Sequence, residues 1–136
     1  MKLNSFEFGL LTGTLRRLVQ EQVDIRQWRK LGAIDCPEGH ALDIGCGQGH
    51  GIKLAVSKFG AGKVDAFDTD ERMLERSRLA TDKLRNIQLR NHSATQIPAA
   101  DASYDLVFDY QVFHHIDDWP AAICEVHRVM KPNAQL

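Results

Sequence analysis

Hydrophobic positions change their spacing along the chain, and this spacing predicts the secondary structure. In the first block they recur every three or four residues, as in amphipathic helices, and most basic side chains fall on the opposite face. We therefore expect one or two helices that end near Gly32. The apolar positions of this block are Leu11, Leu15, Leu18, Val19, Val23, Ile25, Trp28 and Leu31.

Beyond a turn at residues 35–39, short apolar runs alternate with stretches of helical spacing. Thr69 or Asp70 can cap one of these helices, and Asp118 can cap another, which residues 131–132 should end. A regular alternation of strands and helices predicts an α/β fold, in which helices cover both faces of a parallel sheet. The runs expected to form strands are 41–44, 63–67, 87–90 and 106–108.

The later strands differ in how deeply they should be buried. Residues 87–90 alternate between apolar and polar side chains, which suits a half-buried strand at the edge of the sheet. Residues 106–108 are apolar without interruption, which indicates burial on both faces in the interior of the sheet.

The composition is that of an ordinary globular chain, with 136 residues of which 43% are hydrophobic and 26% charged. A net charge of -1 gives no electrostatic basis for binding nucleic acid or a membrane surface. No apolar run approaches the roughly 20 residues that a membrane span needs, and no signal-peptide layout is present. Cys36, Cys46 and Cys124 form no C-x-x-C pair, which predicts a reducing cytoplasm and no zinc site.

Three glycines at alternate positions follow the strand at 41–44 and precede a helix. Without a Cβ atom, Gly45, Gly47 and Gly49 allow the backbone to turn sharply and to lie against a ligand at the amino end of that helix. The pattern indicates a cradle for a nucleotide cofactor. A nicotinamide dinucleotide is disfavoured, because G-x-G-x-x-G would need its third glycine where His50 stands.

A carboxylate follows the second strand at a suitable distance from this cradle. Asp68 lies 23 residues after Gly45, near the spacing at which an acid meets the ribose of a bound nucleotide. It can accept hydrogen bonds from both ribose hydroxyls, each worth about 1.5–3 kcal/mol. Loss of Asp68 should therefore weaken cofactor binding by about tenfold or more.

Four segments, in order along the chain, carry a resemblance to a known family. Residues 42–49, L-D-I-G-C-G-Q-G, closely resemble the first motif of the class I S-adenosylmethionine-dependent methyltransferases. Residues 94–108 resemble the segment around the family's fourth strand, and residues 113–116 resemble its h-H-h element. Residues 125–132, E-V-H-R-V-M-K-P, are similar to its E-x-x-R-h-L-K-P-G-G element.

This resemblance implies a Rossmann-like sheet with the strand order 3-2-1-4-5-7-6. Strands 3-2-1-4 are then present and strands 5-7-6 are absent or supplied elsewhere, because the chain ends where relatives begin a fifth strand. Strand four would offer an open edge to a partner chain or to a second copy. The chain would be a fragment of a longer enzyme, a subunit completed by another chain, or a diverged remnant.

Two parts are expected along the chain. Residues 35–136 form the S-adenosylmethionine-binding domain, truncated after the helix that follows strand four. Residues 1–34 form a helical segment that packs beside the sheet, or that covers the site as a lid, as helices before the first motif often do in families that this one resembles.

The resemblance also implies the cofactor, S-adenosyl-L-methionine, and its contacts. The glycine loop and Asp43 lie at the methionine end of the cofactor, and Asp68 binds the ribose. Asp109 and Tyr110 lie near the methionine moiety or the transferred methyl group. Ser93 stands where the family usually has an acid beside the adenine amino group, and its hydroxyl accepts hydrogen bonds more weakly. The expected contacts are Asp43, Gly45, Cys46, Gly47, Gly49, Asp68, Thr69, Met73, Ser93, Ala94, Asp109 and Tyr110.

Two adjacent histidines are candidates for proton transfer. His114 or His115 could remove a proton from an acceptor as it is methylated, since an ordinary imidazole has a pKa of about 6.5. The alternatives are a packing or loop-capping role, and metal binding together with Asp117 or Asp118. We expect no metal. Cys46, between two glycines, is expected to be a packed thiol rather than a reactive one.

The predicted function is transfer of a methyl group to a small-molecule acceptor. Residues 109–112 lack the N-P-P-Y type sequence with which some relatives methylate DNA adenine or protein glutamine. One alternative is a module that binds the cofactor without turnover and stabilises a partner chain, and a further one is a nicotinamide-dependent oxidoreductase.

Overall fold

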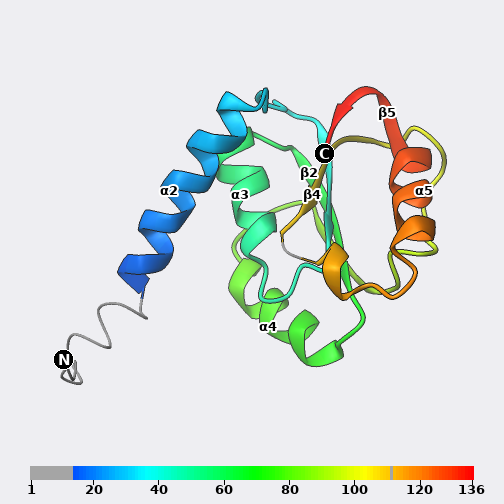
Figure 1. Cartoon of the computed structure of the whole chain (residues 1–136). Coiled ribbons are helices and arrows are strands. Elements are labelled where there is room, and N and C mark those ends of the chain that lie inside the picture. The colour runs from blue at the N-terminus through cyan, green and yellow to red at the C-terminus, as the bar shows by residue number, and fades with distance from the viewer. Residues whose placement is uncertain (1–13, 111) are drawn as a thin grey trace, which may run out of the picture. The chain divides into compact units, whose positions relative to one another are not determined.

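The computed structural model describes residues 14–110 and 112–136, and the chain divides into two compact units, residues 1–34 and 35–136 (Figure 1). In the first unit, helix α2 spans Thr14–Lys30 and carries Arg29 and Lys30 in its last turn. A turn follows at Gly32, where φ is 108°, as expected from the hydrophobic spacing. Part of that expected helical block, including Leu11, lies outside the described residues. Whether residues 1–34 pack on or cover the site stays a prediction.

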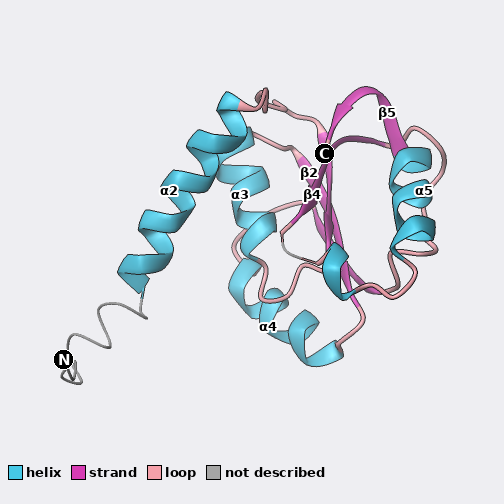
Figure 2. Ribbon diagram, in the orientation of Figure 1, coloured by secondary structure: helices cyan, strands magenta, loops and turns pink. Residues whose placement is uncertain are grey.

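The second unit is a parallel sheet with helices on both faces, as the alternation of strands and helices predicted. Its strand order is β3-β2-β1-β4-β5. Helices α3 and α4 lie on one face of the sheet and α5 lies on the other (Figure 2). The elements are β1 His40–Ile44, α3 His50–Phe59, β2 Lys63–Asp68, α4 Glu71–Thr81, β3 Ile87–Asn91, β4 Tyr104–Asp109, the 3-10 helix η1 Phe113–His115, α5 Trp119–Val129 and β5 Met130–Gln135.

Burial along the strands follows their side-chain pattern. β1, between β2 and β4, is buried over its last four residues, and β4 is buried at four of its six positions. β3 has no buried residue and forms one edge of the sheet. The predictions of an edge position for strand three and an interior position for strand four are therefore confirmed.

Side chains of the sheet form a core on each face. On one face, Leu42, Ile44 and Val107 pack with Val126 and Val129 of α5. On the other face, α3 buries Ile52, Ala55 and Phe59, and the Phe59 ring meets the Phe108 ring edge-on, with centroids 5.4 Å apart. Among the described helices, none is long and apolar enough to cross a lipid bilayer.

Two of the predicted helix caps are present. Asp70, rather than Thr69, caps α4, because its carboxylate accepts a hydrogen bond from the N–H of Arg72 at 2.9 Å. Asp118 caps α5 by accepting from the N–H of Ala121 at 3.2 Å. These caps satisfy N–H groups that the first turn of a helix leaves without partners.

The expectation that strand five is absent was wrong. Residues 130–135 form β5, which pairs in parallel with β4 across a register shift between Tyr104 and Leu106. Lys131 also donates hydrogen bonds to both carboxylate oxygens of Asp105 on β4, at 2.9 and 2.8 Å. The sequence M-K-P-N-A-Q has little apolar character, so its pattern does not indicate a strand. The open edge expected at strand four is covered, and β5 now forms that edge of the sheet.

Candidate functional site

The glycine loop joins β1 to α3 through backbone conformations that favour glycine. Gly45 has a φ of 61°, and a Cβ atom there would lie 2.6 Å from both methyl carbons of Val112. Since real Cβ atoms do not approach other carbons so closely, a side chain at position 45 would displace the segment that carries Val112. Gly45 thus allows the loop and the segment after β4 to lie against each other.

The other end of the loop packs on α4. Gly49 has a φ of 81°, and a Cβ atom there would lie 2.8 Å from Oγ of Ser77 and 3.0 Å from Cγ2 of Thr81. Both side chains are buried. Gly49 is therefore required for the close approach of the loop to α4, a role that the sequence pattern did not reveal.

Asp68 connects the glycine loop with the beginning of α4. One carboxylate oxygen accepts a hydrogen bond from the N–H of Gly47 at 3.0 Å, and the other accepts from the N–H of Asp70 at 2.9 Å. A carboxylate offers about four acceptor sites, so these two bonds leave capacity for a ligand. The side chain lies at the carboxyl end of β2, where Asp68 also lines a cavity.

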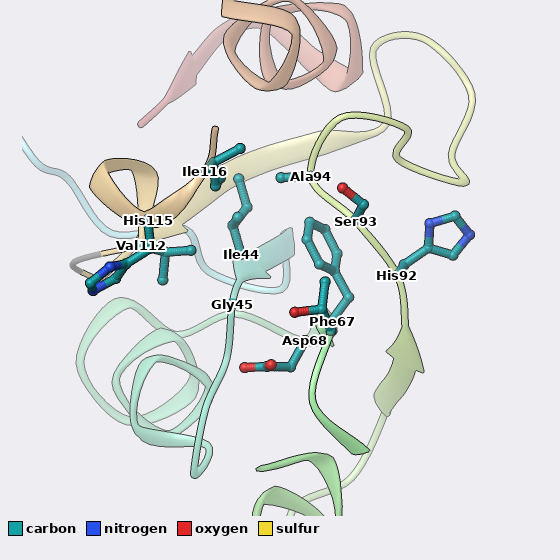
Figure 3. A pocket seen from close by; sticks show the side chains of 11 residues that line it. Ile44, Gly45, Phe67, Asp68, His92, Ser93, Ala94, Val112, His115 and Ile116 are labelled. Atoms are coloured by element: carbon teal, nitrogen blue, oxygen red, sulfur yellow. The ribbon is translucent and has the colours of Figure 1, made fainter. Parts of the chain in front are cut away.

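This cavity has a volume of about 390 Å³ and lies at the carboxyl ends of β1 and β2 (Figure 3). β2 pairs with one side of β1 and β4 pairs with the other, so the order of the strands reverses at β1. Open α/β sheets bind ligands at the carboxyl ends of the strands where the order reverses. Apolar and polar side chains both contribute to the wall, which suits an amphipathic ligand. The lining residues are Ile44, Gly45, Phe67, Asp68, Thr69, His92, Ser93, Ala94, Val112, His115 and Ile116.

Five of the twelve expected cofactor contacts line this cavity, namely Gly45, Asp68, Thr69, Ser93 and Ala94. The hydroxyl of Ser93 lies 2.9 Å from Oγ1 of Thr95 and also accepts the N–H of Thr95 at 3.2 Å. In Figure 3 the ring of His92 points away from the carboxylate of Asp68.

Asp43 lies behind the glycine loop and does not line the cavity. It is 1% exposed, and a Cβ atom on Gly51 would lie 2.6 Å from both of its carboxylate oxygens. Burial raises the pKa of Asp43 to about 7, although the N–H of Ile52 donates to it and lowers that value. Among the described residues, Oδ2 of Asp43 has no hydrogen-bond partner.

Cys46, within the glycine loop, is also buried. It is 5% exposed, and its N–H donates to the carbonyl of Phe67 at 2.9 Å. Burial raises the pKa of its thiol to about 12, and the neighbouring Asp43 carboxylate adds to this effect. The thiol is therefore protonated at neutral pH, which agrees with a packed rather than a reactive cysteine.

Three further predicted contacts lie outside the cavity lining. Asp109 accepts hydrogen bonds from the N–H groups of Val112 at 2.9 Å and Phe113 at 3.3 Å, so it supports the start of η1. The ring of Tyr110 meets that of His50 edge-on, with centroids 5.5 Å apart. Met73 is half-buried on α4.

The two adjacent histidines occupy different positions. Both are exposed on η1, and their ring centroids lie 3.9 Å apart. His115 lines the cavity, whereas His114 does not. The sequence also gave no indication that Val112 and Ile116 form part of the wall, because they reach it only through the turn at η1.

Comparison with known proteins agrees with this architecture. Residues 42–136 match a family model described as a methyltransferase domain. The chain belongs to the class I S-adenosylmethionine-dependent methyltransferases. The fold and the sequence motifs are those of this family, and the cofactor of the family is S-adenosylmethionine.

Several members are similar over most of this chain. It is 34% identical over 113 residues to demethylmenaquinone methyltransferase of Staphylococcus epidermidis, which covers 80% of this chain and 47% of that protein. A SAM-dependent methyltransferase from Aquifex aeolicus superposes with a TM-score of 0.69 and 26% identity, over 80% of this chain and 59% of that one. The YcgJ protein from Bacillus subtilis gives a TM-score of 0.71 and 25% identity, over 83% and 48%. The chain thus spans less than half the length of curated relatives that it matches, 31% in one and 47% in another.

Proposed function

We propose that this chain binds S-adenosylmethionine in the cavity beside the glycine loop, and that the protein transfers the methyl group to a small molecule. The observation that carries the proposal is Asp68. Its carboxylate stands in the cavity wall at the end of β2 and is hydrogen-bonded to the N–H of Gly47 in the loop. A nucleoside is bound by a carboxylate that accepts hydrogen bonds from the ribose hydroxyls, and by a loop whose backbone can approach the ligand closely.

The residues present fit this cofactor. A volume of about 390 Å³ is within the range of small-molecule sites, which is roughly 300–1,000 Å³. Asp68 would accept from the ribose hydroxyls, Thr69 and Met73 would flank the adenine, and Ser93 and Ala94 would lie beside its amino group. The backbone of residues 45–49 would hold the methionine end.

The remaining expected contacts are proposed around that same end. Asp43 would act from behind the glycine loop, and Cys46 would act as a packed residue within it. Asp109 and Tyr110 would lie near the methionine moiety or the transferred methyl group. None of these four lines the cavity wall, so we expect their substitution to weaken binding less than loss of Asp68 does.

When bound, S-adenosylmethionine supplies a methyl carbon that its sulfonium makes electrophilic. The task of the protein is to hold and orient, which can contribute roughly 7–11 kcal/mol without any protein nucleophile. Of the two histidines, His115 lines the cavity, and we keep it as the candidate that accepts a proton from the methyl acceptor.

A small-molecule acceptor is supported by the name of one relative, demethylmenaquinone methyltransferase, and by a net charge of -1. The three cysteines are free, which supports a reducing compartment, and we propose the cytoplasm. A partner chain or a second copy would pair with the sheet at β5.

Calorimetric titration with S-adenosylmethionine and S-adenosylhomocysteine tests this function, with NAD as the comparison ligand. We expect saturable binding of both adenosyl ligands and none of NAD. No heat and no thermal protection at millimolar ligand would refute the proposal. Binding without methyl transfer to a broad panel of acceptors would instead favour a module that binds the cofactor without turnover.

A further inference from the structure

One wall of the cavity belongs to a segment without regular secondary structure. Residues 92–103 connect β3 to β4, and this described stretch contains neither a helix nor a strand. Its first residues, including Ser93 and Ala94, line the cavity. Local bonds, such as that between Ser93 and Thr95, join only close neighbours. The position of the wall must therefore be fixed by contacts with other elements.

Two charged residues of α5 supply such contacts. Glu125 accepts a hydrogen bond from the N–H of Ile97 at 2.8 Å, and Arg128 donates to the carbonyl of Ile97 at 2.9 Å. Both backbone polar groups of Ile97 thus bond to α5. Arg128 also donates to the carbonyl of Ala99 at 2.7 Å and to the carboxylate of Asp101 at 2.9 Å.

The two residues form a rigid unit. Arg128 donates through Nε and Nη2 to the two carboxylate oxygens of Glu125, both at 2.8 Å. This two-bond arrangement fixes the orientation of the planar guanidinium, so its remaining N–H groups point in defined directions. These hydrogen bonds, with a contribution from the Ile97 N–H, lower the pKa of Glu125 to about 2, so the pair is charged at neutral pH.

Apolar packing holds the same segment from the inside. Ala94 and Ile97 are 5% and 3% exposed, and they belong to the core cluster that includes Val126 and Val129 of α5. Neither Glu125 nor Arg128 lines the cavity. They act on its wall from α5, on the opposite face of the sheet from α3 and α4 (Figure 2).

We propose that Glu125 and Arg128 are positioning residues for cofactor binding, which hold Ser93 and Ala94 in the cavity wall through the backbone of residues 97–99. This inference rests on the proposed function, since it assigns the wall a ligand. A simpler possibility is that the pair only stabilises α5 as an ion pair three residues apart. The two possibilities predict different effects of exchanging the charges.

The test measures S-adenosylhomocysteine binding by calorimetry and amide hydrogen exchange without ligand, on the full chain. We expect Arg128→Gln to weaken binding about tenfold, at the lower end of the roughly 10- to 100-fold loss seen when a residue that orients a metal ligand is removed. Exchange should accelerate at residues 92–103 and not in β1. Arg128→Lys keeps the positive charge but lacks the planar guanidinium. It should lose less affinity than Arg128→Gln and should also be the better folded of the two variants.

The control is Arg78→Gln, which removes an exposed ion pair with Glu71 on α4, at 2.9 Å. It should change neither measurement. The double variant Glu125→Arg with Arg128→Glu restores an ion pair on α5, but it places a donor against the N–H of Ile97 and an acceptor against two carbonyls. Its affinity should stay low.

Native affinity in the double variant, or in Arg128→Gln, would overturn the proposal. Unchanged exchange at residues 92–103 in Arg128→Gln would do the same. If the native chain binds neither adenosyl ligand, the proposed function fails and with it the assignment of a ligand to this wall. Faster exchange in Arg128→Gln would even then show that the pair fixes the segment, which separates the two failures.

Discussion

Replacement of Asp68 by Asn tests the site most directly. The native carboxylate accepts the N–H of Gly47 at 3.0 Å and the N–H of Asp70 at 2.9 Å. An amide of the same shape has one acceptor oxygen instead of two and carries no charge. Asp68→Asn should therefore keep one of these bonds, lose the other, and accept from the ribose more weakly.

The magnitude follows from the number of charge-assisted bonds at stake. Loss of one such bond costs about 1.5–3 kcal/mol, which raises a dissociation constant by about 10- to 150-fold. We expect a change of this size for S-adenosylhomocysteine, measured by isothermal titration calorimetry at constant ionic strength.

Asp70→Asn is the matched control. It removes the same charge two residues away, and Asn caps a helix about as well as Asp. The control should bind within about twofold of the native chain, because Asp70 does not line the cavity. Equal weakening in both variants would show that the loss is a general effect of charge, and native affinity in Asp68→Asn would refute the ribose contact.

Three further predictions concern stability. Gly45→Ala should lower the free energy of unfolding by about 1–3 kcal/mol, because its Cβ atom would lie 2.6 Å from the methyl carbons of Val112; adding Val112→Ala should recover part of that loss in urea denaturation. Burial raises the pKa of Asp43 from 3.8 to about 7, so the folded state keeps a proton that the unfolded state loses. The contribution of Asp43 to stability should therefore fall as pH rises from about 4 to 7, by at most about 1.4 kcal/mol per pH unit, and Asp43→Asn should remove that slope. Lys131→Met removes both hydrogen bonds to Asp105 and should speed amide exchange in β5 by at most about fivefold, with β1 unchanged.

Each of these has an outcome that contradicts it. A double variant no more stable than Gly45→Ala would show that the left-handed backbone, rather than the clash with Val112, sets the cost. A constant difference in stability between native and Asp43→Asn protein from pH 4 to 7 would mean that Asp43 titrates normally. Unchanged exchange in β5 of Lys131→Met would remove Lys131 from the forces that hold this strand.

Much of the fold could be predicted because its signals are local. The glycine loop, the acid at the end of β2 and the cap at Asp118 each depend on what the backbone needs at one position. The alternation of strands and helices then leaves few arrangements of the sheet. Strand β5 was missed because its sequence is polar, and its place is determined by pairing with β4 and by the Lys131 bonds to Asp105.

The site was predicted less completely than the fold. Asp68 and Ser93 line the cavity, whereas Asp43 and Gly49 lie against α3 and α4 outside its lining. The contacts of all four with the cofactor stay predictions. Sequence spacing gives the strand end at which a residue lies. The direction of its side chain depends on what packs behind it.

The amino-acid sequence alone determined that a strand, a loop with glycine at three alternate positions and a helix precede a carboxylate at nucleotide spacing, because each of these is a short-range requirement of the chain. Only the tertiary structure decided that Val112 packs against Gly45 and that residues 130–135 form a fifth strand. It also decided that Glu125 and Arg128 hydrogen-bond to the backbone of Ile97. These contacts join residues distant in sequence. Their stability comes from packing and hydrogen bonds that exist only once the sheet has formed.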